Sequence, residues 1–151
     1  MMDLKLYKRP LAALTVTGDK VRVTPGLLSK LGHALSVANI NVYCVSMGEY
    51  SVSFFVEETD HEKARDALHA AVDNTSLDAL SLLRNIGMIT VTGQELIDSP
   101  GMLRHLIDPI ARSGINLLTV SSSFDSIIVF VTWNDARKTY ELIENRFLKG
   151  L

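Results

Sequence analysis

The stretch PGLLSKLGHALSVANINVYCVSMGEYSVSFFV, residues 25–56, decides the fold of this chain. A related stretch, PGMLRHLIDPIARSGINLLTVSSSFDSIIVFV, occurs 75 residues later at residues 100–131. At that offset residues 2–76 align with 77–151 without a gap, and 19 of the 75 pairs are identical. Chance matching at ordinary composition gives roughly 6%. The chain is therefore two copies of one unit.

The quoted stretch predicts a helix followed by two strands. Thr24 is the expected N-cap, and Pro25 suits the first helical position. Leucines then recur at helical spacing, and two runs rich in β-branched and aromatic residues follow. The expected elements of both copies are strands at 2–8, 11–17, 40–46, 51–56, 77–83, 86–92, 115–121 and 126–132, and helices at 25–38, 60–72, 100–112 and 135–147.

The second copy lacks a last strand, because only residues 148–151 follow its second helix. Residues 2–8 are the repeat counterpart of 77–83, so we expect them to pair with 86–92 and complete the second unit. The predicted fold is α+β. It consists of two ferredoxin-like βαββαβ units, each an antiparallel sheet with two helices on one face. The expected units are residues 10–84 and residues 85–151 with the strand from the N-terminus.

Composition narrows the function class. With 151 residues, 47% hydrophobic, 21% charged and a net charge of −2, the chain is typical of a soluble globular protein. It lacks the basic excess that nucleic acid or an anionic membrane would attract. No apolar run has the length of a membrane span, and the start MMDLKLYKRP lacks the apolar core of a signal peptide. The single cysteine, Cys44, favours a reduced, cytoplasmic setting.

A glycine loop, Pro-Gly, an apolar helix and Ile-Asn before a Ser-containing strand occur in both copies, and this pattern resembles the ACT domain. In particular, two stretches resemble the tandem regulatory half of aspartokinases: VSFFVEETDHEKARDALHAAV (52–72) looks like the end of one ACT unit, and ITVTGQELIDSPGMLRHLIDPIARSGINLLTVSSSFDSIIVFV (89–131) looks like the start of another. The resemblance implies a regulatory protein that binds an amino acid effector and has no cofactor. It also implies a partner such as the kinase subunit of a biosynthetic enzyme. A homodimer is expected because open four-stranded sheets leave edges that natural proteins cover or pair.

In that family, effectors sit between the loop after the first strand and the start of the second strand. The resemblance therefore implies ligand contacts by Asn41 and Asn116, whose amides can both donate and accept. Backbone N–H groups at the helix start suit a carboxylate. Many aspartokinases carry an Asp two residues after this Asn, and Tyr43 and Leu118 here argue against lysine as the effector. The other implied contacts are Asp19, Thr24, Pro25 and Gly26 in the first copy, and Asp98, Ser99, Pro100 and Gly101 in the second.

Several other interpretations stay open. Either asparagine could bond only local backbone, and the serines at 121–123 are typical of a polar turn. The sequence has no glycine-rich phosphate loop, so no kinase half is expected. The chain could also be the C-terminal regulatory fragment of an aspartokinase, or a structural dimerisation module without a ligand. A small ferredoxin-like enzyme would have to use His33, His105 or Asp108, which lack an evident acid–base partner; with His61 and His69, the histidines share no metal-ligand spacing.

Overall fold

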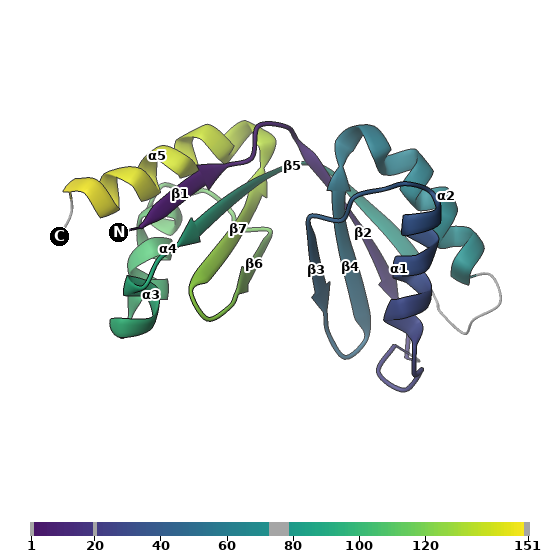
Figure 1. Cartoon of the computed structure of the whole chain (residues 1–151). Helices are drawn as coiled ribbons and strands as arrows, with labels where there is room; N and C mark the ends of the chain where they lie inside the picture. Colours follow the sequence, from purple (N-terminus) through teal and green to yellow (C-terminus); the bar gives the residue numbers. More distant parts are fainter. Residues whose placement is uncertain (1, 20, 73–78, 150–151) are drawn as a thin grey trace. The chain divides into compact units, whose positions relative to one another are not determined.

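The computed structural model describes residues 2–19, 21–72 and 79–149 (Figure 1). The chain divides into two compact units. The first unit is Leu11–Arg84, and the second combines the residues up to Pro10 with those from Asn85 onward. Each unit is a sheet with helices packed on one of its faces, so the predicted fold class is confirmed.

The first unit has the element order expected of a ferredoxin-like fold. Its sheet order is β3-β4-β2-β5, with β2 antiparallel to β4 and β3 antiparallel to β4. One face of β2 and β4, including Leu14 and Phe54, packs on Leu31 and Leu35 of the first helix and Leu68 of the second. The elements are β2 (Leu11–Thr17), α1 (Leu27–Val37), β3 (Cys44–Met47), β4 (Ser51–Glu57), the 3-10 turn η1 (Glu58–Asp60), α2 (His61–Val72) and the first part of β5 (Ala79–Thr92).

The second unit repeats this order with its last strand taken from the N-terminus. β1 pairs antiparallel with β5, with Asp3 opposite Thr92 and Leu6 opposite Ile89, as the repeat predicts. The sheet order is therefore β1-β5-β7-β6. The elements are β1 (Asp3–Leu6), the second part of β5, α3 (Glu95–Asp98), α4 (Met102–Arg112), β6 (Thr119–Ser122), β7 (Ser126–Thr132) and α5 (Trp133–Lys149).

The strand β5 differs from the prediction. Two strands at 77–83 and 86–92 are expected, of which residues 77 and 78 lie outside the described part, but the chain forms one strand, Ala79–Thr92. Asn85 lies inside it with φ of 55°, a left-handed conformation that asparagine tolerates better than most residues. The boundary between the two units falls beside this residue.

Both first helices begin later than predicted. The N-cap of α1 is Gly26 with φ of 77°, and the N-cap of α4 is Gly101 with φ of 87°. The expected roles of Thr24 as N-cap and Pro25 as first helical residue are therefore wrong. The physical reason is that this chain entry requires a left-handed residue at the cap, and glycine adopts that conformation without a Cβ clash.

The strands after these helices also begin later than predicted, because the pairs Asn39-Ile40 and Gly114-Ile115 still belong to the helix ends. The Ile40 N–H bonds the Leu35 carbonyl at 3.0 Å, and the Asn39 N–H bonds the Ser36 carbonyl at 2.9 Å. With Asn39 left-handed at φ of 59°, this is a Schellman motif, which places an apolar residue against the helix it terminates. Ile40 is accordingly buried. The strand proper starts at Cys44, and Asn41 lies in the loop before it.

Candidate functional site

The second unit contains a pocket at the point where α4 begins. Its volume is about 310 Å³. The pocket lies between the one-turn helix α3, the first residues of α4 and the β6–β7 hairpin, which Figure 1 shows at the same end of the unit. The lining residues are Leu96, Ile97, Ser99, Pro100, Gly101, Met102, Leu103, Ser122, Ser123 and Ile127.

The pocket combines a helix N-terminus with hydroxyl groups and an apolar wall. α4 has 11 residues, and no side chain caps its start at Gly101. The first N–H groups of a helix have no partner within the helix, and the helix dipole favours negative charge there. Ser99, Ser122 and Ser123 add three hydroxyls that can donate or accept. Leu96 and Ile127 supply apolar surface, so the site suits a small molecule with a carboxylate and a short side chain.

The first unit differs at the matching place. Arg22 in the loop after β2 forms an ion pair with Glu49 of the β3–β4 turn, with Nη1 and Oε1 2.6 Å apart. The Arg22 guanidinium also lies 5.7 Å from the ring centre of Tyr50. The repeat counterpart of Arg22 is Ile97, a residue that lines the pocket of the second unit. A polar link therefore joins the loop to the hairpin in the first unit, where the second unit has a pocket with an apolar wall.

Three residues of the predicted set, Ser99, Pro100 and Gly101, come together in the pocket. Asp98 ends α3 and is exposed; its Oδ1 lies 3.5 Å from the Gln94 amide nitrogen. The predicted contacts of the first unit are also exposed, namely Asp19, Thr24, Pro25 and Gly26.

The two asparagines lie elsewhere in their units. Asn41 and Asn116 are exposed and follow the C-terminal ends of α1 and α4, whereas Gly26 and Gly101 precede the N-terminal ends. A helix of 11 residues is roughly 16 Å long at about 1.5 Å per residue. Within one unit, therefore, a ligand the size of an amino acid cannot contact both the asparagine and the Pro-Gly corner.

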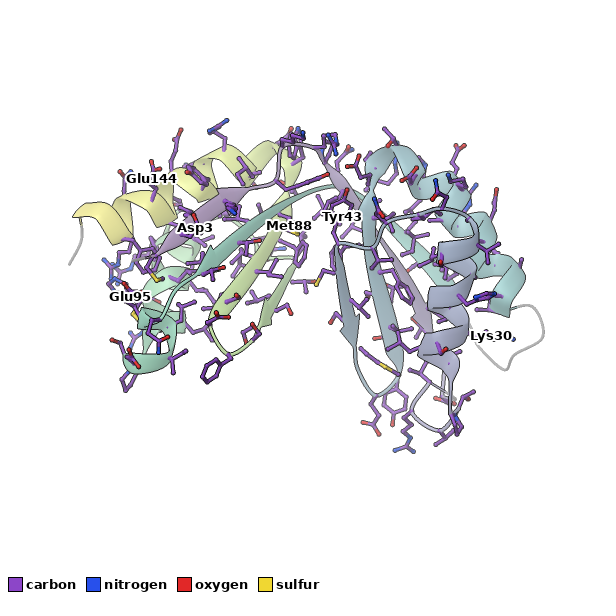
Figure 2. All side chains as sticks on the ribbon, viewed as in Figure 1. Asp3, Lys30, Tyr43, Met88, Glu95 and Glu144 are labelled. Atoms are coloured by element: carbon purple, nitrogen blue, oxygen red, sulfur yellow. The ribbon has the colours of Figure 1, made fainter. Side chains whose placement is uncertain are left out.

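Tyr43 occupies the position where many aspartokinases have Asp, and its side chain is hydrogen-bonded within the first unit. Tyr43, labelled in Figure 2, donates its hydroxyl proton to Glu57 Oε1 of β4 at 2.9 Å. This bond ties the segment before β3 to its neighbouring strand. Tyr43 therefore has a structural hydrogen bond rather than a free acidic group to offer an effector's ammonium.

Sequence reasoning missed Ser122 and Ser123, which it assigned to a polar turn, and the apolar residues of α3. The hairpin does turn there, since the Ser123 N–H bonds the Ser126 carbonyl at 2.8 Å. The turn, however, lies against the start of α4. The signal that could have found it is the repeat: Ser122 and Ser123 replace Met47 and Gly48 of the first copy.

The described part of the chain offers neither a metal site nor a membrane-spanning helix. No group of three or more His, Cys, Asp or Glu side chains there is placed to hold a metal ion. None of its helices is both long and apolar enough to cross a membrane.

The geometry defines a class: two ferredoxin-like units in tandem, with a small-molecule pocket at a helix start. Comparison with known families agrees, because models of the ACT domain match residues 14–72 and residues 81–145. The chain belongs to the ACT-domain family and carries two ACT domains, which confirms the resemblance in the sequence.

Curated relatives and solved structures extend the comparison to aspartokinases. The chain is 24% identical over 145 residues to bifunctional aspartokinase/homoserine dehydrogenase 2 of Arabidopsis thaliana. It is 27% identical over 134 residues to the bifunctional enzyme of Haemophilus influenzae. These matches cover 91% and 83% of this chain but only 16% of either enzyme.

Among solved structures, the regulatory subunit of aspartate kinase from Thermus flavus matches with a TM-score of 0.80 at 20% identity. That match covers 97% of this chain and 96% of the subunit. The aspartokinase alpha and beta subunits match with a TM-score of 0.82 at 19% identity over 95% of this chain and 96% of that one. The tandem ACT fold of this chain is thus the fold of aspartokinase regulatory subunits.

Proposed function

We propose that this chain is an amino-acid-binding regulatory protein related to the allosteric region of aspartokinase, and that it is not itself catalytic. The observation that carries the proposal is the pocket of about 310 Å³ at the uncapped start of α4. In this proposal the effector carboxylate accepts hydrogen bonds from the first N–H groups of α4 and from Ser99. The side chain of the effector packs against Leu96 and Ile127.

Regulation follows if the effector prefers one state of a larger assembly. A ligand shifts an equilibrium only through its different affinity for the two states. The assembly that we propose is a homodimer associated with a cytoplasmic biosynthetic enzyme, such as a kinase subunit. Support comes from similarity to an aspartokinase III crystallised with lysine and aspartate, and to the separate regulatory subunits described above. A dimer could also place Asn116 of one copy near the pocket of another.

A second candidate is the regulatory part of a longer aspartokinase. The observation that favours it is coverage, because the chain spans only 16% of its curated relatives. The two candidates share the effector chemistry and differ in whether the kinase is on the same polypeptide. Mass spectrometry of the natural gene product distinguishes them.

The experiment that tests the binding proposal is a thermal-shift screen of the twenty amino acids. At 100 times its dissociation constant a ligand stabilises the native state by about 2.7 kcal/mol. For a chain of this size that corresponds to roughly 5–10 °C in Tm. Ser122→Ala with Ser123→Ala should reduce the shift, while Ser46→Ala with Ser51→Ala in the first unit should not. If no amino acid moves Tm, the effector proposal fails and the structural dimerisation module is favoured.

A further inference from the structure

A second pocket of the second unit lies between β1 and α5, and the effector proposal does not use it. Its volume is about 480 Å³. Figure 2 shows α5 over β1, with Glu144 on the helix and Asp3 on the strand. The lining residues are Leu6, Tyr7, Lys8, Trp133, Ala136, Arg137 and Tyr140. We call it the β1–α5 pocket.

One wall of this pocket is helix α5, and the other is the end of β1 with the two residues that follow it. Trp133, Ala136, Arg137 and Tyr140 follow helical spacing and so share one face of α5. The opposite wall is the end of β1, which a hydrogen bond of 2.9 Å from the Tyr7 N–H to the Met88 carbonyl holds against β5. Tyr7 and Lys8 follow β1 in the segment that leads to β2, so this wall is strand at Leu6 and loop beyond it.

Small residues bring α5 onto the sheet beside the pocket. A Cβ on Gly87 would lie only 2.5 Å from the Cβ of Ala136. Contact this close is possible only because Gly87 has no side chain. Trp133 and Tyr140 stand about one helical turn to either side of Ala136. Two large rings therefore lie on either side of Ala136, whose small methyl group leaves space between α5 and the end of β1.

The chemistry of the lining is cationic and aromatic. Among the described residues, no carboxylate lies within ion-pairing distance of Lys8 or Arg137. Trp133, Tyr140 and Tyr7 contribute three aromatic rings. Asp135 and Glu141 are the acidic residues of α5 nearest in sequence to Arg137, but neither lines the pocket, and Asp135 Oδ2 accepts a hydrogen bond from the Thr132 hydroxyl at 3.0 Å. Glu144 lines a separate small cavity. The charged residues of the lining itself are therefore Lys8 and Arg137, which are both cationic.

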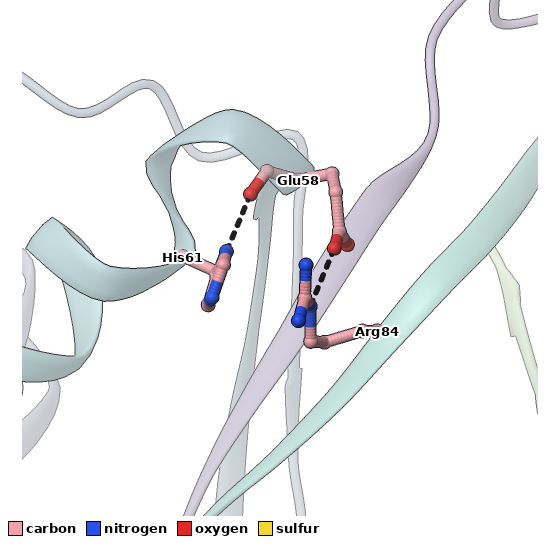
Figure 3. Close-up of polar contacts among 3 residues, drawn as sticks. All are labelled: Glu58, His61 and Arg84. Carbon is pink, nitrogen blue, oxygen red and sulfur yellow. Dashed lines mark hydrogen bonds and ion pairs between the residues drawn. The ribbon is translucent and has the colours of Figure 1, made fainter.

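The first unit shows that the fold alone does not produce this chemistry. Glu58 stands where the second unit has Trp133, and its Oε1 lies 2.6 Å from Arg84 Nε (Figure 3). His61 replaces Ala136, and its Nδ1 lies 2.7 Å from the Glu58 carbonyl oxygen (Figure 3). Glu62 replaces Arg137. The matching place in the first unit thus holds a structural ion pair and the opposite charge.

We propose that the β1–α5 pocket is a second ligand site, which binds a small organic anion with a planar ring. The anionic group lies between Lys8 and Arg137, and the ring packs against Trp133 and Tyr140, since aromatic faces and an Arg plane both stack on flat ligands. A volume of about 480 Å³ is within the range of small-molecule pockets. Nucleoside monophosphates and aromatic carboxylates both have this chemistry.

The test uses the position of Trp133, which is the single tryptophan of the chain. AMP and 4-hydroxyphenylacetate are titrated separately into the full chain, with binding followed by calorimetry and by the tryptophan emission. Adenosine, which has the ring without the anion, and inorganic phosphate, which has the anion without the ring, are the paired controls. We expect one of the two ring anions to bind with a Kd below about 1 mM, and the stronger binder identifies the source.

Variants then assign the site. Lys8→Gln and Arg137→Gln should each weaken binding about tenfold, because each removes a charge-assisted contact. The matched control is Lys138→Gln, an exposed neighbour on α5 outside the lining, and it should change Kd less than twofold. An unchanged melting temperature in all three shows that the fold is intact.

The proposal is overturned if neither ring anion binds, if adenosine or phosphate alone binds as tightly, or if Arg137→Gln binds like Lys138→Gln. The double serine variant of the α4 pocket should leave this binding unchanged. Failure of the effector proposal and failure of this one are therefore distinguishable.

Discussion

Truncating two leucines of β1 should destabilise the second unit, although the first unit directly follows β1 in sequence. Leu4 and Leu6 are partly buried against the core of the second unit. Truncation of a fully buried leucine to alanine costs about 2–5 kcal/mol, so a half-buried one should cost about 1–2 kcal/mol. Leu4→Ala with Leu6→Ala should therefore cost the second unit about 3 kcal/mol. A unit of this size has roughly 4–11 kcal/mol of stability in total.

The assay is native-state hydrogen exchange read by mass spectrometry. We expect lost protection in the second part of β5, in β7 and in α5, with α1 and α2 unchanged. The matched control is Asp3→Ala with Lys5→Ala, because these side chains are exposed on β1 and form only a surface ion pair of 3.5 Å. A surface pair contributes about 0–1 kcal/mol. Greater loss of protection in the first unit than in the second would refute the reasoning.

Three further predictions follow from local geometry. Gly87→Ala should cost the second unit about 1–3 kcal/mol, because its Cβ would lie 2.5 Å from Ala136 Cβ. Chemical denaturation measures this cost. Adding Ala136→Gly should restore only part of it, because glycine within a helix itself costs about 0.5–1 kcal/mol. Gly101→Ala should cost about 1–2 kcal/mol through backbone strain alone, since φ is 87° and no atom lies within 4 Å of the new Cβ. A loss of stability under about 0.3 kcal/mol in the same assay contradicts that account. Glu49→Gln should lower Tm by less than about 3 °C, because its ion pair with Arg22 is exposed. Hydrogen exchange should nevertheless become faster in the loop after β2. An unchanged exchange rate would show that the ion pair does not hold this loop in place.

The repeat explains why the fold could be predicted so far. Residues 2–8 and 77–83 occupy equivalent repeat positions, and the second copy needs one more strand, so the exchange of β1 follows from counting elements. The same comparison could not give the helix starts. Whether Thr24 or Gly26 caps α1 depends on the φ of Gly26. Threonine and glycine are both common N-cap residues, so the loop sequence does not decide between them.

The candidate site was predictable only where its residues are neighbours in the sequence. Ser99, Pro100 and Gly101 are adjacent in sequence, so one chain corner brings them together. Ser122 comes from a hairpin that follows α4, and its approach to the corner depends on packing. The ACT resemblance groups Asn116 with this corner, but Ile115 forms the Schellman end of α4, with its N–H bonded to the Ile110 carbonyl at 3.3 Å. Asn116 and Gly101 therefore lie at opposite ends of α4, which has 11 residues.

The pairing of Asp3 with Thr92 also sets an order of events on the ribosome. β1 is synthesised before the first unit, but its partner, the second part of β5, emerges only after that unit. Domains fold as units during synthesis, N-terminal first, so Leu11–Arg84 can form its core while β1 is still unpaired. β5 gives its first part to that core and its second part to β1 and β7. The strand that completes the first unit thus also pairs with a segment that was synthesised before that unit.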